Sequence, residues 1–372
     1  MRLRNQYILI SKMHLSLHKK AYRDILLIAN GHEVYKNDLS KFVQNIHHID
    51  IYSDDEHHLN SLDSFKSYIK NKNLLDRETK VIYASGLEGK KDIQQYIESN
   101  FDVFGIPLTQ FDEISDLNKI HNSLLKNKIK IPEISDTFHY KSLSKSYNSS
   151  GGIGVGNNIF SSNTYFQKFI PGKTFSISFI ASDSDPVILG FNQLFIVENN
   201  TKYPFLHAGA MTIDFEQPYR GYMLDWIKAI TKYYSLTGFI STDFKIFSNN
   251  LEILDINPRL SGSYRLYTRK YKNLMFNHMK PGDPLNLKSN DYFSYIILYA
   301  KNDLVVDRRI SSIEDVSDTP NIGQAIKKDM PIMTLNIRAN NQHNLLKEIK
   351  RRIISAMKII DCYNTQLDYE QY

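Results

Sequence analysis

The sequence predicts a mixed α/β and α+β fold, with a parallel α/β region first and antiparallel strands after it. In the N-terminal third, short apolar runs alternate with helix-like stretches, which is typical of a parallel sheet. From Thr137 onward the strand-like segments are joined by Gly, Ser and Asn, which indicates antiparallel pairing. A chain of 372 residues is long enough for two or three domains with cores of their own.

The N-terminal region contains three strand candidates and one helix candidate, and a second helix candidate follows it. The strands are expected at Asp24–Ile28, His48–Tyr52 and Lys80–Gly86. The helices are expected at Lys91–Ser99 and Ser115–Lys126, and Pro132 prevents the second from continuing. We therefore expect residues 1–112 to form an α/β domain.

The rest of the chain divides at Pro281 and Pro284, because two close prolines interrupt any regular element. We expect a middle domain over residues 113–285 and a small C-terminal α+β domain over 286–372. Strands are expected within Tyr165–Ile180, Pro186–Val197, Gly238–Phe247, Leu251–Ile256 and Tyr292–Tyr299. Helices are expected at Tyr222–Leu236 and at the C-terminus, where the apolar face would comprise Leu346, Ile349, Ile353, Met357 and Ile360.

Composition favours a cytoplasmic protein. Cys362 is the single cysteine, so no internal disulfide can form. No apolar stretch approaches the ~20 residues that span a bilayer, and the N-terminus lacks a signal-peptide core. The net charge of +6 is spread along the chain, which favours a solvated exterior over nucleic-acid binding. We therefore expect neither a membrane nor a nucleic acid as partner.

The strongest chemical signal lies in the strands ending the middle region. Across a hairpin, Asp243 and Asp255 are expected on one sheet face, and Asn257, two residues on, on the same face. Two carboxylates and an amide oxygen suit Mg²⁺ when nucleotide phosphates complete its shell. Arg259 follows and would neutralise a transferring phosphoryl group. Two solvent-facing aspartates before an ordinary Asn-Pro turn are an equal alternative for this motif alone.

Two further segments have weaker signals. Lys145 precedes a loop with Gly151, Gly152 and Gly154, whose backbone N–H groups would approach phosphate oxygens, although such loops are more often flexible hairpin tips. The second segment ends in Pro-Gly and would offer backbone groups to an adenine edge, or is simply a strand and turn; it comprises Gln167, Lys168, Phe169, Ile170, Pro171 and Gly172.

Taken in this order, the segments resemble the ATP-grasp superfamily, in particular its carboligase-like branch related to biotin carboxylase. The metal strands are the most specific part. Three further stretches resemble that branch, namely Tyr83–Glu88, Leu206–Ala210, and Asp318–Gly323 together with Pro331–Thr334. The similarity covers the chain from about residue 24.

The resemblance implies an ATP-grasp fold, with ATP held between two α+β subdomains. A flap at about 136–180 would carry the glycine loop of Gly151, Gly152 and Gly154, and Lys145 would contact the phosphates. Gln167 to Ile170 would hold adenine. Asp243, Asp255 and Asn257 would bind Mg²⁺, or Mn²⁺, and Arg259 would steady an acyl-phosphate.

The sequence departs from the family pattern in three places. The first phosphate lysine of the family is matched only roughly, by Lys119, which is more typical of a surface helix residue than of a ligand. Asp255 stands where the family usually has Glu, and Lys168 stands where the hinge usually has an acidic residue. Glu252 is expected to be a poor replacement for the missing glutamate, because its odd offset from Asp255 would place it on the opposite face of the strand.

The family chemistry implies an ATP-dependent ligase that forms an amide from a small-molecule carboxylate and an amine, on an amino-acid-like or cofactor-precursor substrate. Relatives are commonly dimers, so a homodimer is left open. The branch is associated with methanopterin- and methanofuran-linked metabolism. Two alternatives remain: carboxylation through carboxyphosphate, and an ATP-binding regulatory protein with weakened catalysis.

A histidine- and aspartate-rich stretch at 47–58 is interpreted as a solvated loop in preference to a zinc site.

Overall fold

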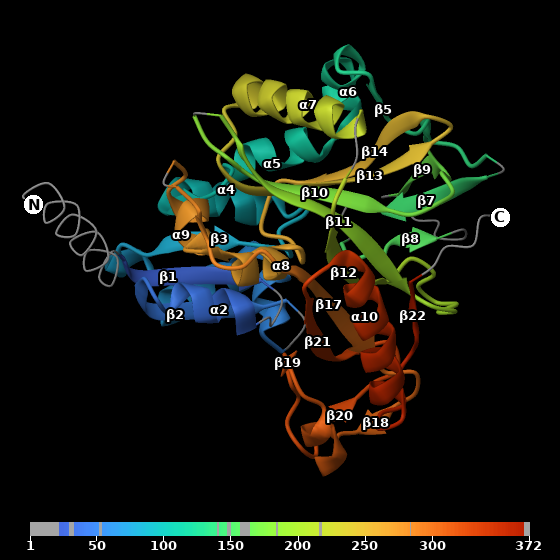
Figure 1. Cartoon of the computed structure of the whole chain (residues 1–372). Helices are drawn as coiled ribbons and strands as arrows, with labels where there is room; N and C mark the ends of the chain where they lie inside the picture. Colours follow the sequence, from blue (N-terminus) through green and yellow to red (C-terminus); the bar gives the residue numbers. More distant parts are fainter. Residues whose placement is uncertain are drawn as a thin grey trace, which may run out of the picture.

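The computed structural model describes residues 22–29, 33–51, 54–139, 141–146, 150–156, 164–183, 185–215, 218–282 and 284–367. Figure 1 shows an N-terminal α/β layer in blue, a large sheet in green and yellow with helices over its outer face, and an orange-to-red C-terminal part that extends this sheet.

The N-terminal sheet is parallel throughout, in the order β2-β1-β3-β4. Its strands are β1 (Tyr22–Ala29), β2 (Val43–Asp50), β3 (Lys80–Tyr83) and β4 (Asp102–Phe104). Between and beside them lie α2 (Glu33–Leu39), η1 (Asp54–Leu59), α3 (Leu62–Asn71), η2 (Leu75–Arg77) and α4 (Lys91–Asn100). In β1, Ile25 and Leu27 pack into one core while Leu26 and Ile28 pack into another. A strand buried on both faces is apolar throughout, which confirms the expected parallel α/β region.

The large sheet has ten strands and is antiparallel apart from the edge pair of β14 with β5. Its order is β19-β21-β17-β12-β11-β10-β13-β14-β5, with β22 also paired to β11. The strands are β5 (Ile129–Lys130), β10 (Phe175–Ala181), β11 (Val187–Val197), β12 (His207–Ile213), β13 (Gly238–Phe247), β14 (Asn250–Asn257), β17 (Tyr292–Tyr299), β19 (Val316–Ser317), β21 (Pro331–Ala339) and β22 (Thr365–Gln366). The sheet runs across the expected boundary at residue 285, and the division into three domains stays a prediction.

A small sheet in the order β6-β9-β7-β8 overlaps the expected flap, although β6 precedes the expected start at residue 136, and we refer to this sheet and its loops as the flap. Its strands are β6 (Ile134–Ser135), β7 (Ser142–Ser146), β8 (Val155–Gly156) and β9 (Thr164–Lys168). Two further strand pairs are β15 (Tyr271–Lys272) with β16 (Asn286–Leu287), and β18 (Leu304–Val305) with β20 (Ala325–Ile326). Because β7 and β9 are antiparallel neighbours, Lys145 on β7 lies opposite Tyr165 on β9.

Helices cover the large sheet with their apolar sides. On its outer face, Trp226, Ile227 and Ile230 of α7 share a core with Phe244 and Ile253 of the sheet. The helices of the middle and C-terminal parts are α5 (Leu108–Ser115), α6 (Leu117–Lys126), α7 (Tyr219–Tyr234), α8 (Tyr264–Lys270), α9 (Leu274–Met279), η3 (Arg308–Ser312) and α10 (Gln342–Met357).

Two helix predictions need correction. The helix expected from Ser115 begins at Leu117, because the Asp116 carboxylate accepts a hydrogen bond from the Asn118 N–H at 3.0 Å and caps it. In α10, the buried face comprises Leu345, Ile349, Ile353 and Ala356. Met357 was therefore placed on the wrong side, because it is exposed, whereas Leu346 is half-buried against the same core and Ile349 and Ile353 are buried as expected.

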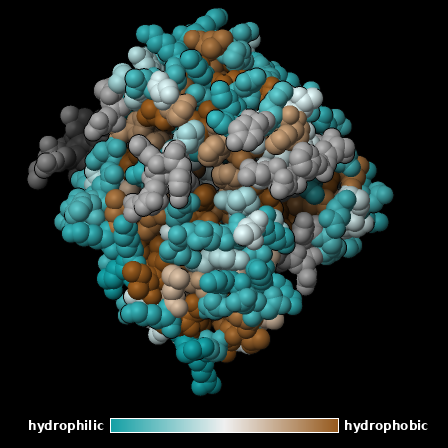
Figure 2. All heavy atoms as spheres, turned by 90° about the vertical axis from the view of Figure 1, so that its right-hand side faces the viewer, coloured by the Kyte–Doolittle hydropathy of each residue, from teal (hydrophilic) through white to brown (hydrophobic). Residues whose placement is uncertain are grey.

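The outer surface is mainly polar where it can be seen from one side. Figure 2 shows hydrophilic residues over most of that face, with apolar residues between them. Among the described residues, no helix has the length and apolar character needed to cross a membrane.

Candidate active site

A cavity of about 1040 Å³ lies between the flap, the large sheet and the N-terminal sheet. It is lined by all but one of the predicted site residues, namely Lys145, Gly151, Gly152, Gln167, Lys168, Phe169, Ile170, Asp243, Asp255, Asn257 and Arg259. Gly154 is the exception: its carbonyl accepts a hydrogen bond from Ser146 N–H at 2.9 Å, within the β7–β8 turn. The volume is at the upper end for small-molecule sites and leaves room for two ligands.

The metal motif lies on one face of the β13–β14 hairpin. Asp243 is directly opposite Asp255, and Asn257 is opposite Ser241. Between Asp255 and Ile253 the register skips Leu254, which forms a bulge. Such bulges redirect side chains and are frequent beside active sites.

The bulge also reverses the prediction for Glu252. Cross-strand partners point to the same face, and Glu252 pairs with Lys245. Since Lys245 and Asp243 both line the cavity, Glu252 is on their face of the sheet, not on the opposite one. Glu252 itself does not line the cavity.

Burial and mutual repulsion raise the pKa of Asp243 to about 7. Desolvation is the larger cause, and the charge of Asp255 adds to it, while Lys145 and Arg259 act in the opposite direction. Asp255 is exposed to solvent through the cavity, yet protein surrounds it at longer range, and this desolvation raises its pKa as well. Because the Asp255 side chain is exposed in the cavity, a ligand can reach its carboxylate.

These residues fit a magnesium ion. Two carboxylates directly opposite each other repel, and Lys145 and Arg259 only partly offset this. A divalent cation would remove the repulsion, and two carboxylates with one amide leave coordination positions for water and phosphate, as Mg²⁺ prefers. Within the described part of the chain, no three His, Cys, Asp or Glu side chains cluster as a metal site would require. An all-protein metal cage is therefore absent from those residues.

Lys145 is held beside the two aspartates. Its Nζ donates to Gln167 Oε1 and to the carbonyl oxygen of Leu254, each at 3.2 Å. Burial lowers the pKa of Lys145, but Tyr165 and the carboxylates of Asp255 and Asp243 outweigh burial and raise it overall. The ammonium is therefore retained as a fixed positive charge where a phosphate would need one.

Arg259 forms an ion pair with Glu88 of the N-terminal region, with Nε 3.0 Å from Oε1. The other carboxylate oxygen of Glu88 accepts a hydrogen bond from Gly86 N–H at 2.6 Å. Both side chains are largely buried. The guanidinium thus lines the cavity in a fixed orientation set by a residue about 170 positions earlier in the chain.

The glycine loop lies against the segment before β12. The His207 N–H donates to Gly151 O at 2.9 Å. A Cβ added to Gly152 would lie 1.9 Å from Phe205 O, and Gly152 has a φ of +78°. Only glycine fits this close approach. Tyr147–Ser149 of the same loop lie outside the described residues.

In the predicted hinge, Gln167 to Ile170, several backbone groups already form hydrogen bonds within the protein. The N–H groups of Lys168 and Phe169 donate to Glu133 O and Lys141 O, and Ile170 O accepts from Lys245 Nζ at 2.7 Å. Among the described residues, the Ile170 N–H has no acceptor and is the hinge donor left for a nucleobase. Burial lowers the pKa of Lys245 to about 8.

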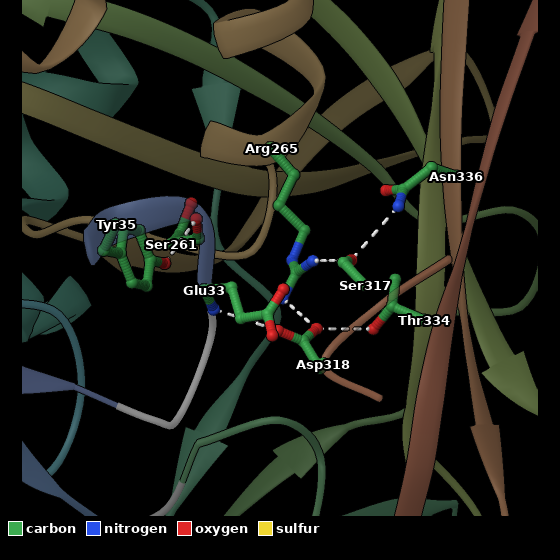
Figure 3. A network of polar contacts seen from close by, with 8 residues as sticks. All are labelled: Glu33, Tyr35, Ser261, Arg265, Ser317, Asp318, Thr334 and Asn336. Atoms are coloured by element: carbon green, nitrogen blue, oxygen red, sulfur yellow. Dashed lines mark hydrogen bonds and ion pairs between the residues drawn. The ribbon is translucent and has the colours of Figure 1, made fainter. Parts of the chain in front are cut away.

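The cavity lining also includes Asp318, and Figure 3 shows the polar network around it. Its carboxylate pairs with Arg265 of α8, accepts from Thr334 Oγ1 of β21 at 2.9 Å, and accepts from the Glu33 N–H of α2 at 3.0 Å. Nearby, Tyr35 donates to Ser261 O at 3.2 Å. The three additional stretches that carried the family resemblance all contribute to this cavity, through Ser85, Glu88, His207, Asp318 and Thr334.

Sequence reasoning assigned no role to Glu88 or Lys245. Lys245 has a detectable signal, because it is a second charged residue two positions after Asp243, on the same face of a strand that is mostly buried. Glu88 has no local signal, since its partner Arg259 is brought near only by the fold. The stretch 47–58 is not the loop that was expected: His47 and His48 lie on β2, where His47 pairs with buried Asp24 at 2.8 Å and His48 contacts Ala29 O, and η1 begins at Asp54. The side chains of 54–56 lie outside the described residues.

Comparison with known proteins gives one domain match and many structural matches. Residues 114–263 match the model of the ATP-grasp domain family. An uncharacterized protein of Methanocaldococcus jannaschii is 26% identical over 175 residues, which is 47% of this chain and 42% of that protein. The chain therefore matches less than half the length of that relative.

Two solved structures share nearly the whole fold. Biotin carboxylase from Campylobacter jejuni, solved with a β,γ-ATP complex, superposes with a TM-score of 0.65 at 13% identity, covering 92% of this chain and 93% of that one. An L-amino acid ligase from Bacillus licheniformis superposes with a TM-score of 0.63 at 11% identity, covering 88% and 96%. At such low identity the likeness establishes the ATP-grasp fold.

Proposed function

Because this chain belongs to the ATP-grasp superfamily, we propose that it is an ATP-dependent ligase that joins a carboxylate to an amine. The γ-phosphoryl group of ATP is transferred to the carboxylate to give an acyl-phosphate and ADP. The amine then attacks the acyl carbon, and phosphate leaves. The observation that carries the proposal is the Asp243–Asp255 pair, opposed on one face beside Lys145 in a cavity large enough for two ligands.

The residues have distinct roles in this proposal. Asp243, Asp255 and Asn257 hold Mg²⁺, which when bound neutralises part of the phosphate charge. Lys145 contacts the phosphate chain, with the backbone of Gly151 and Gly152 above it, and the hinge residues Gln167 to Ile170 contact the base. Arg259, fixed by Glu88, faces the charge that develops during transfer. Most of the rate enhancement then comes from positioning and charge neutralisation.

The substrates are proposed to be small molecules that bind beside Asp318 in the same cavity. The fold is similar to that of an L-amino acid ligase, which supports an amino-acid-like carboxylate or amine. The fold is equally similar to that of biotin carboxylase, which supports the alternative of carboxylation through carboxyphosphate. That reaction would require bicarbonate, so dependence on bicarbonate distinguishes the two. The glutamate residue usual at the second metal position is replaced by Asp255, and a regulatory protein without turnover is the remaining alternative.

The test is ADP release from ATP and Mg²⁺ across a panel of amino acids, other carboxylates and amines, with bicarbonate as a separate arm. The proposal expects release that needs both a carboxylate and an amine and is lost in Asp243→Asn. Asp225→Asn, on the exposed side of α7, is the matched control. Release that depends only on bicarbonate supports carboxylation instead, and equal release by wild type and Asp243→Asn contradicts the site.

A further inference from the structure

The cavity lining contains a histidine–tyrosine pair to which the proposed phosphate chemistry assigns no role. His207 Nε2 lies 2.8 Å from the hydroxyl oxygen of Tyr295, and both residues line the cavity. His207 is the first residue of β12, and Tyr295 is on the neighbouring strand β17. Among the described lining residues, His207 is the one histidine.

The pair faces the loop that follows Arg259. A Cβ added to Gly262 would lie 2.4 Å from the Tyr295 hydroxyl oxygen and 3.7 Å from His207 Nε2. The Tyr295 hydroxyl can approach this backbone so closely because residue 262 is a glycine; a Cβ at this position would collide with the hydroxyl. Since Gly262 is three residues after Arg259, the pair and the guanidinium belong to adjacent parts of one cavity wall.

The position of the pair is fixed by surrounding contacts. His207 is held through its main chain, which donates to Gly151 O at 2.9 Å and accepts from Tyr299 Oη at 3.1 Å. The groups that face Tyr295 electrostatically are Arg265 on α8, Tyr35 on α2, Tyr299 on its own strand and Asp243 on β13. Burial raises the pKa of Tyr295, so the phenol keeps its proton in the resting protein.

We propose that Tyr295 and His207 form the relay that removes the proton from the attacking amine. This inference rests on the proposed ligase function. The amine arrives as an ammonium ion, and one of its protons passes to the Tyr295 oxygen as the phenol proton passes to His207 Nε2; the imidazolium later releases this proton to solvent. The freed lone pair of the nitrogen bonds to the acyl carbon while the carbon–oxygen bond to phosphate breaks, and phosphate leaves with that electron pair and takes up the second nitrogen proton. General-base catalysis of this kind contributes about 10²–10⁴-fold.

The test compares two nucleophiles on the purified full chain. Hydroxylamine is a weak base that is neutral at pH 7 and traps acyl-phosphates as hydroxamates, whereas alkylamines must be deprotonated. Each proteinogenic L-amino acid serves in turn as the carboxylate, with ATP, Mg²⁺ and either hydroxylamine or methylamine. The variants are His207→Gln and Tyr295→Phe, with Tyr292→Phe as control, because Tyr292 lies on the same strand but bonds Asp214 outside the cavity.

We expect both variants to lose about 100-fold in amide formation with methylamine and to keep hydroxamate formation within about threefold. Parallel loss with both nucleophiles would assign the pair a structural role and overturn the relay, as would unchanged rates with methylamine. Since Tyr295 is buried, thermal unfolding of each variant is recorded, and His207→Gln decides if Tyr295→Phe is unfolded. Absence of hydroxamate with wild type across the amino acids and the other carboxylates of the panel would contradict the ligase proposal itself, and the relay with it.

Discussion

Lys145 Nζ lies 3.2 Å from the carbonyl oxygen of Leu254, the residue that the register between β13 and β14 skips. The bulge turns this carbonyl out of the strand ladder and toward the flap. The same bulge sets Asp255 opposite Asp243. One local irregularity thus positions the lysine and both carboxylates of the proposed site together.

Replacing Lys145 tests its role at the phosphates. Lys145→Met is expected to weaken ATP binding about 10- to 100-fold, because a charge-assisted contact to phosphate is lost and the two aspartates lose a compensating cation. The ATP Kd is measured by calorimetry. Lys228→Met, an exposed lysine on α7, is the control. An unchanged Kd in Lys145→Met would remove the lysine from the site.

The glycine loop provides a pair of matched substitutions. Gly152→Ala places a methyl group 1.9 Å from Phe205 O, whereas a Cβ on Gly151 meets nothing within 4 Å at a similarly positive φ. Both changes impose backbone strain, but only the first prevents the loop from docking. We expect Gly152→Ala to lower kcat at least about tenfold more than Gly151→Ala. Equal effects of the two substitutions on ADP release would show that turnover does not need the glycine loop to pack against Phe205.

Asp318 is expected to stabilise the fold. Its partner Arg265 is 4% exposed, so Asp318→Asn leaves a buried cation without its counter-ion. Loss of one partner of a buried pair costs about 3 kcal/mol in free energy of unfolding. Urea denaturation measures this, with Asp307→Asn as control, because the exposed Asp307–Arg309 pair is screened by solvent and is expected to contribute little to stability. Similar losses in both variants would contradict the assignment.

His278 predicts a pH-dependent loss of stability. It is buried against Gly105 and Gly238, its Nδ1 accepts from the Phe239 N–H at 3.0 Å, and desolvation lowers its pKa to about 4. The unfolded chain takes up a proton near pH 6.5 and the folded chain only near pH 4, so stability falls as the pH drops through this window.

The expected loss is about 3 kcal/mol in free energy of unfolding between pH 7 and pH 4. Urea denaturation at several pH values measures it. His278→Asn keeps an acceptor for the Phe239 N–H and removes the titration, so its stability should vary less over the same range. A variant with the same pH slope as wild type would refute the role of His278.

Much of the architecture can be predicted from local patterns. Apolar runs predict the parallel strands β1 and β3 but only the end of β2, which begins at Val43, and alternation predicts β13 and β14 with Asp243 and Asp255 on one face. These patterns succeed because burial on one or two faces of a sheet determines residue type directly.

Features that depend on tertiary contacts escape this reasoning. The bulge at Leu254 has no signal in the alternation, so Glu252 was placed on the wrong face. In α10 the apolar residues Leu345 and Leu346 are adjacent, and only packing against β17 and β21 selects Leu345 as the buried one. The Glu88–Arg259 and His207–Tyr295 contacts join residues far apart in sequence.

The most direct test of the proposed magnesium–nucleotide site is the ATP Kd of wild type and Asp255→Asn, measured by calorimetry with Mg²⁺ and again with EDTA. We expect Mg²⁺ to tighten ATP binding by at least about tenfold in wild type and to have little effect in Asp255→Asn, because one of two metal-binding carboxylates is lost. An equal response to Mg²⁺ in the two proteins would contradict the site.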